Sequence, residues 1–245
     1  MIQLFNTILA EPLYNLLAGI FAVVPGHDLG VTIIILTIII KAVLWPLSAK
    51  AMKSQRALQE VQPQLKELKE KFKDDKEGLA KAMMELYSKE KVNPLSSCLP
   101  LLIQLPIIIA LYRVLLHGIN GDGNYYNLYS FVPDPGVIVP TFMGIVDLST
   151  PNIILAILAG IFQFIQAKMM SLKKPPKQVQ GSPGAKDEDM AAAMNRSMLY
   201  FMPVITVVIG ASLPAGLTLY WLVVNIIAVL QQLVYLRPKK KSVEV

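Results

Sequence analysis

The chain has 245 residues, of which 54% are hydrophobic and 16% are charged, whereas soluble domains are about 45 to 50% apolar and about 25% charged. This composition places the protein in a membrane and excludes an ordinary soluble domain. The net charge of +6 suits anionic lipid head groups, an acidic partner or RNA. The single cysteine excludes an internal disulfide framework, and the two histidines have no nearby carboxylate or cysteine cluster, so we expect no metal and no cofactor.

Residues 1–27 carry apolar side chains at helical spacing, including Phe5, Leu9, Leu13 and Leu16, with polar residues between them. This pattern predicts an amphipathic helix lying in the outer membrane interface. The main alternative is a sixth span with the N-terminus inside, because the other loops would then keep their sides.

Long runs with almost no charge predict the membrane spans, since about 20 helical residues cross the hydrocarbon layer. The run from Ser197 to Leu236 has no charge and would be about 60 Å long as one helix, twice the membrane thickness. It must therefore turn, and Gly210 to Gly216 is the plausible place. The five predicted spans are residues 28–50, 93–116, 149–170, 197–211 and, with the turn, 212–236.

The basic residues of the remaining segments indicate on which side of the membrane each segment lies. The eleven basic residues from Lys50 to Lys91 and the four from Arg237 to Lys241 mark cytoplasmic regions, which places the N-terminus outside and the C-terminus in the cytoplasm. Apolar positions between 51 and 92 predict a cytoplasmic helical hairpin kinked at Pro63. The other predicted segments are an outer loop at 117–148, a flexible cytoplasmic linker at 171–196 and a basic tail at 237–245.

Lys41 is the only charged residue inside the apolar runs that predict the spans, which are residues 29–49, 92–112, 148–167 and 197–236. A charge near the membrane centre costs about 2.5 to 3.5 kcal/mol on insertion scales, which marks a functional site by default. We place it about 9 Å deep, counted along one helix from Leu47. Snorkelling of the side chain to the head groups is a simpler explanation.

Polar residues in the other spans suggest a hydrated groove around Lys41, although such groups also serve as hydrogen-bonding contacts between helices. The candidates are Gln104, Gln163, Gln166, Thr206, Thr218 and Asn225, with Gln231 and Gln232 as further polar residues of the last span. Signals of intramembrane proteases, zinc proteases and nucleotide-binding loops are lacking from the sequence, so we expect a protein that is not an enzyme.

Three stretches of the sequence resemble the YidC family of membrane protein insertases. They run from Ile38 to Leu47, with a basic residue shortly before Pro-Leu; from Val92 to Pro106, with Asn-Pro, Cys, Pro and Gln-Leu-Pro at fixed offsets; and from Leu213 to Asn225. The resemblance implies an all-α membrane protein, with five transmembrane helices around a hydrophilic groove that is closed on the outer side. In that comparison Lys41 matches the cation of the groove, and Gln104, Gln166 and Trp221 match its polar lining.

The resemblance also implies a function in the bacterial plasma membrane. The groove would receive segments of nascent membrane proteins and release them sideways into lipid without ATP, with the ribosome, the Sec translocon and anionic lipids as partners and no DNA. Ribosome contact would rely on the hairpin, since the basic tail is short. One departure is that the family usually has Arg where this chain has Lys41, and lysine is a point charge without the planar fork of arginine. The alternative function is a small-solute transporter or channel.

Overall fold

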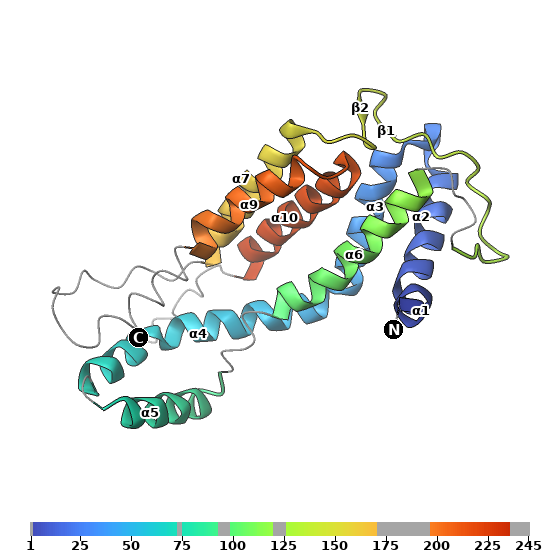
Figure 1. Cartoon of the computed structure of the whole chain (residues 1–245). Helices are drawn as coiled ribbons and strands as arrows, with labels where there is room; N and C mark the ends of the chain where they lie inside the picture. Colours follow the sequence, from blue (N-terminus) through green and yellow to red (C-terminus); the bar gives the residue numbers. More distant parts are fainter. Residues whose placement is uncertain (1, 73–74, 93–98, 120–125, 171–196, 236–245) are drawn as a thin grey trace, which may run out of the picture.

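The computed structural model describes residues 2–72, 75–92, 99–119, 126–170 and 197–235. These residues are almost entirely helical, with a helical hairpin projecting at one end of the molecule and a short pair of strands at the opposite end (Figure 1). The predicted linker 171–196, the basic tail 237–245 and the motif residues 93–98 lie outside the described ranges.

The N-terminal segment is helical throughout. It comprises α1 (Ile2–Phe5), the π-helical turn η1 (Asn6–Ala10) and α2 (Glu11–Val23). The wide turn directly precedes Pro12, which has no N–H to donate to the carbonyl four residues earlier. The same pattern recurs where η4 (Ser197–Phe201) precedes Pro203 in α9 (Met202–Gly210).

The first predicted span is not one straight helix. It consists of α3 (Leu29–Val43) and the start of α4 (Trp45–Lys71), which meet at an angle of 64°. Pro46 explains the bend, because its ring would clash with the carbonyl of Ala42 and it has no N–H to bond it. The span predicted over 28–50 is therefore bent in this structure, and the helix that forms the first arm of the hairpin begins at Trp45, inside the range predicted for that span.

The hairpin is formed by α4 and α5 (Lys76–Lys89), which pack through the apolar positions read from the sequence. Val61, Leu65, Leu86 and Val92 are buried between the two arms. Asp75 caps α5 by accepting a hydrogen bond from the backbone N–H of Gly78 at 2.8 Å.

The remaining elements follow along the chain as α6 (Leu99–Ile119), β1 (Thr141–Phe142), β2 (Val146–Asp147), α7 (Ile153–Met170), η4, α9 and α10 (Ala215–Tyr235). Helix α10 is central: it packs against α7, α3, α6 and α4 (Figure 1). Its buried residues include Tyr220, which is 1% exposed.

The antiparallel strands β1 and β2 lie in the segment predicted as a loop. Their turn has positive φ at both Met143 and Gly144, as a type I′ turn requires. Such short strands have no alternating pattern long enough to be read from the sequence.

By length and composition, two helices could cross a membrane, Gln3–Val23 and Ala215–Tyr235, and the bent pair α3 and α4 would make a third if it is one span. The other apolar helices are shorter: Leu102–His117, Ile153–Met169 and Leu199–Gly210. The number of five spans therefore stays a prediction.

Candidate functional site

Lys41 lies in the last turn of α3, two residues before the helix ends at Val43. Its side chain is half-buried and has no hydrogen-bond or ion-pair partner among the described residues. Because the helix bends at Leu44, the depth counted along one axis from Leu47 does not apply. The ammonium sits beside a bend, where the chain turns from the helix bundle into the hairpin.

Gln104 and Tyr220 connect α6 to α10. The Gln104 Nε2 donates a hydrogen bond to the Tyr220 hydroxyl at 2.6 Å. Gln104 is half-buried and Tyr220 is almost completely enclosed. The predicted groove residue thus has a fixed partner that the sequence alone did not identify.

Three further predicted residues bind neighbouring helices. The Thr206 hydroxyl donates to Gln163 Oε1 at 2.7 Å, which joins α9 to α7. The Thr218 hydroxyl donates to the carbonyl of Gly210 at 3.0 Å, and Asn225 Nδ2 donates to the carbonyl of Ala159 at 3.2 Å. Thr206, Thr218 and Asn225 are at most 4% exposed, so their polar groups act as contacts between helices in this structure.

The Asn225 contact sets the register of α10 against α7. Both helices run from the β1–β2 end toward the hairpin end (Figure 1). Seven residues after the contact, almost two full turns in each helix, Gln232 and Gln166 return to nearly the same faces. We therefore place Gln166 and Gln232 at one level of the bundle.

Lys41 lies nearer to the strand-pair end of the bundle than that level. Helix α10 runs alongside α3 in the same direction, because Gly216 faces Ile33 and Tyr235 reaches Trp45. Counted from the Gly216–Ile33 contact, Lys41 is eight residues along α3 and is therefore level with Val224, about two turns before Gln231 on α10. We call Gln166, Gln231 and Gln232 the inner polar layer. Trp221 is half-buried on α10 between Thr218 and Asn225, and it lies outside this layer.

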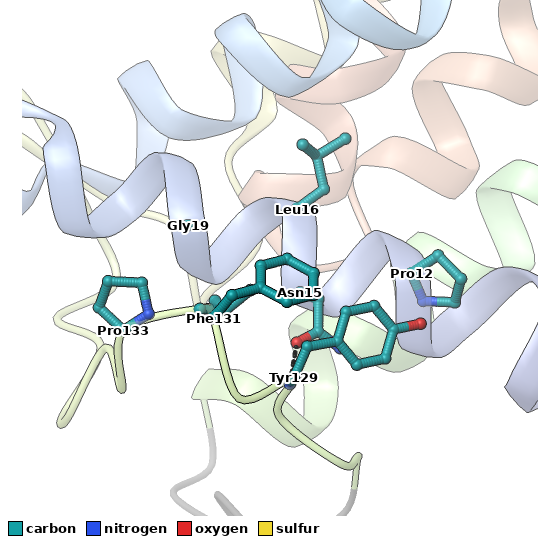
Figure 2. Close-up of a pocket in the computed structure, with 8 residues that line it drawn as sticks. Pro12, Asn15, Leu16, Gly19, Tyr129, Phe131 and Pro133 are labelled. Carbon is teal, nitrogen blue, oxygen red and sulfur yellow. Dashed lines mark hydrogen bonds between the residues drawn. The ribbon is translucent and has the colours of Figure 1, made fainter.

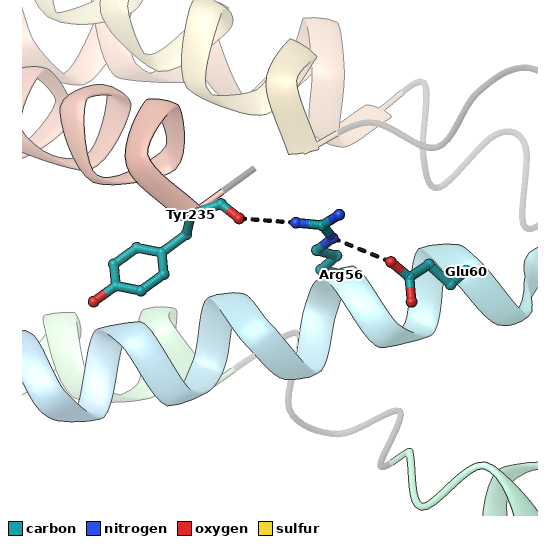
Figure 3. Close-up of polar contacts among 3 residues, drawn as sticks. All are labelled: Arg56, Glu60 and Tyr235. Atoms are coloured by element: carbon teal, nitrogen blue, oxygen red, sulfur yellow. Dashed lines mark hydrogen bonds and ion pairs between the residues drawn. The ribbon is translucent and has the colours of Figure 1, made fainter. Parts of the chain in front are cut away.

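The end of α10 is held by α4 at two points, which we call the Tyr235 clamp. Figure 3 shows the Arg56 guanidinium between Glu60 and the carbonyl of Tyr235. Arg56 Nη1 donates to that carbonyl at 3.1 Å, and Trp45 Nε1 donates to the Tyr235 hydroxyl at 3.1 Å. A cation at the last carbonyls of a helix is also favoured by the helix dipole.

The opposite end of the bundle is closed by paired polar groups. Asp28 accepts hydrogen bonds from the backbone N–H groups of Val31 at 2.8 Å and of Met143, which joins the start of α3 to the strand pair. The N–H groups of Ala215 and Gly216, which begin α10, donate to the carbonyls of Thr150 and Leu148. The first orphan donors of α10 are thereby satisfied by the outer loop.

A shallow cavity of about 390 Å³ lies between α2 and residues 129–133. Figure 2 shows Leu16, Phe131 and two prolines around it, with Asn15 bonded to the backbone of Tyr129. The Asn15 side chain also donates to the carbonyl of Asn127 at 2.9 Å. The Asn15 amide is therefore occupied, and apart from Asn15 and Tyr129 the side chains that line the cavity are apolar. No cluster of three or more metal-binding side chains occurs in the described part of the chain.

The sequence placed Gln231 and Gln232 among the polar residues that could line the groove but did not single them out. The usable signal was the interval of seven residues from Asn225 to Gln232, which returns to one helix face. Tyr220 and Tyr235 carried no comparable signal, since tyrosine is also common in apolar cores and interfaces.

The family model described as 60Kd inner membrane protein matches residues 20–242 of this chain. Membrane protein insertase YidC of Pelobacter propionicus is 36% identical over 228 residues, covering 93% of this chain and 38% of the relative. The insertase of Methylobacillus flagellatus is 39% identical over 92% of this chain, and that of Francisella philomiragia is 40% identical over 85%. The chain spans only about a third of the length of these relatives, 38%, 35% and 32% respectively.

A solved structure also resembles this fold. It is the crystal structure of an active YidC insertase with the first transmembrane domain resolved, with a TM-score of 0.53 and 23% sequence identity. The match covers 87% of this chain and 43% of that chain. At this identity the likeness concerns the fold.

Proposed function

The chain belongs to the family of the 60Kd inner membrane protein, which includes the YidC insertases, and we propose on that basis that it is a multi-pass inner membrane protein that inserts other membrane proteins. In this proposal, segments of nascent membrane proteins enter a hydrophilic groove from the cytoplasm and leave sideways into lipid. Lys41, Gln104, Gln166 and Trp221 line the groove. The ribosome, the Sec translocon and anionic lipids are the proposed partners.

The observation that carries this proposal is the unequal state of the polar groups at the two ends of the bundle. At the hairpin end, Lys41 and the amides of the inner polar layer have no partners among the described residues. At the outer end, Asp28 and the first N–H groups of α10 are paired with the outer loop. This arrangement supports a polar indentation that reaches only partway through the membrane from the cytoplasmic side.

Such an indentation lowers the barrier to insertion without an ATP site. Moving a hydrophilic tail across hydrocarbon removes its water, which is costly for each unpaired polar group. A half-channel shortens the dry distance, and a cation at its end attracts acidic residues where charges are poorly screened. Burial of the substrate's apolar segment in lipid then drives the step.

The test is insertion of a single-span substrate with an acidic tail into proteoliposomes that contain only this protein. We expect Lys41→Glu to stop insertion because the new carboxylate repels the tail, and Lys41→Arg to preserve it. Normal insertion by Lys41→Glu would refute the role of the cation. Loss in both variants would indicate a structural role instead.

The small-solute transporter remains the alternative function, since it too needs buried polar groups. A transporter site must be reached alternately from both sides, and the paired outer end favours the insertase. Saturable solute flux in the same proteoliposomes would support the transporter.

A further inference from the structure

Gln231 and Gln232 differ from the buried asparagine and threonine side chains of the described residues. Eight polar side chains are buried in the described part of the chain, and six of them have hydrogen bonds: Asn15, Thr32, Thr37, Thr206, Thr218 and Asn225. Gln231 and Gln232 are each 1% exposed, yet neither the oxygen nor the nitrogen of either amide has a partner. The two are adjacent in sequence and lie one turn from the end of α10.

A buried amide without partners is costly, about 1 to 3 kcal/mol for each unsatisfied group. Packing alone does not need this cost, because methionine fills nearly the same volume without polar atoms. Unsatisfied buried groups in a native protein therefore call for an explanation. Here the explanation must supply donors and acceptors to two adjacent amides.

The chemistry of an amide selects its complement. Each glutamine offers two N–H donors and a carbonyl acceptor and carries no charge, which matches another amide better than an isolated ion. A polypeptide main chain presents one N–H and one carbonyl at nearly every residue. When a segment without secondary structure enters a membrane, these groups lose water and need partners.

We propose that Gln231 and Gln232 bind the main chain of the segment that is being inserted. This inference rests on the proposed insertase function and adds the part of the substrate that is recognised. Binding to the main chain is independent of side-chain identity, so one site serves segments of different sequence. Lys41, about two helical turns nearer to the outer end, interacts with acidic side chains of the same segment.

In this structure the amides are enclosed, so a segment reaches them only when the inner ends of the helices separate. The Tyr235 clamp lies one turn away and joins α10 to α4. Separation of α4 from α10 breaks its two hydrogen bonds and exposes unpaired amides, which gain partners from the entering segment.

The first test replaces both amides, in Gln231→Met/Gln232→Met, and measures insertion and thermal unfolding on the same purified protein. We expect insertion to fall about tenfold, the effect of losing about one net hydrogen bond, while the melting temperature stays equal or rises. Leu230→Met is the matched control, because Leu230 is 56% exposed on the same turn and we expect normal insertion. A lowered melting temperature together with lost insertion would assign the glutamines a structural role and overturn the proposal.

The second test changes the main chain of the substrate. An ester in place of one amide bond removes an N–H and weakens the carbonyl as an acceptor without altering side chains. We expect a series of single esters along the entering segment to reduce insertion at defined positions with the native protein and to have no effect with Gln231→Met/Gln232→Met.

The two proposals fail in different ways. If the native protein inserts no substrate in proteoliposomes, the insertase function itself fails. If native protein inserts the all-amide substrate and the ester series has equal effects in native and double-methionine proteins, only main-chain recognition fails.

Discussion

Single residues decide how closely the outer end of the bundle can pack. Gly30 lies in the first turn of α3, directly against Phe142 of β1, and a Cβ at this position would overlap the Phe142 ring. The neighbouring Asp28 fixes the same strand pair through its carboxylate. The position therefore needs glycine for space, since its φ is that of an ordinary helix.

We predict that Gly30→Ala destabilises the protein by about 1 to 3 kcal/mol, because overpacking displaces the ring of Phe142. Thermal unfolding in detergent measures this effect. Gly19→Ala is the matched control, since a Cβ there meets only Val132 at 3.9 Å, and alanine is the better helix former. The double variant Gly30→Ala/Phe142→Ala should lose less stability than the two single effects added. Unchanged unfolding of Gly30→Ala would contradict the close contact.

At the scale of elements, hydrogen bonds of the N-terminal helix indicate where this helix lies relative to the membrane. Its middle residue Asn15 is bonded to the outer loop at Asn127 and Tyr129. Near its start, Asn6 accepts a hydrogen bond from Arg113 in the outer half of α6. If Gln3–Val23 crossed the membrane, this polar loop would lie at the depth of the membrane centre, where unpaired backbone groups are costly. The contacts therefore favour a helix in the outer interface.

We predict that Thr7→Cys, in a chain whose single cysteine Cys98 is replaced by serine, reacts with a membrane-impermeant maleimide added from outside. Thr7 is exposed in η1. Ser88→Cys on the exposed surface of α5 is the control for the cytoplasmic side and should react only after the membrane is opened. Reaction of Thr7→Cys only from the cytoplasm would support a sixth span instead.

Patterns in the sequence predicted the helices better than the bends and contacts between them. The apolar intervals of the hairpin are the ones that pack, and the glycines and Pro214 mark the turn between α9 and α10. The bend at Leu44 was missed because the apolar run continues across it, although Pro46 was a local signal. The roles of Thr206 and Asn225 could not be predicted from the sequence, because the sequence does not distinguish a polar residue that binds a neighbouring helix from one that lines a groove.

At the scale of the whole molecule, the two ends of the bundle differ in the hydrogen bonds that hold their helices together. The outer end is joined by backbone groups of the loop to α3 and α10, and most of these groups cannot be removed by substitution. The inner end is joined at the Tyr235 clamp by the side chains of Trp45 and Arg56. An opening of the bundle should therefore begin at the hairpin end.

We predict that Arg56→Ala raises the rate at which Gln231→Cys, in the chain lacking Cys98, reacts with an impermeant thiol reagent from the cytoplasmic side. The loss of one charge-assisted hydrogen bond, about 1.5 to 3 kcal/mol, corresponds to roughly a tenfold or larger increase in the open population. Lys53→Ala is the matched control, because it removes an exposed cation from α4 that has no contact with Tyr235. Thr218→Cys, 1% exposed near the outer end in the native chain, should stay unreactive from both sides. Reaction of Gln231→Cys from outside would mean a continuous aqueous path and would exclude a half-channel, whereas equal rates in Arg56→Ala and Lys53→Ala would show that the clamp does not control opening.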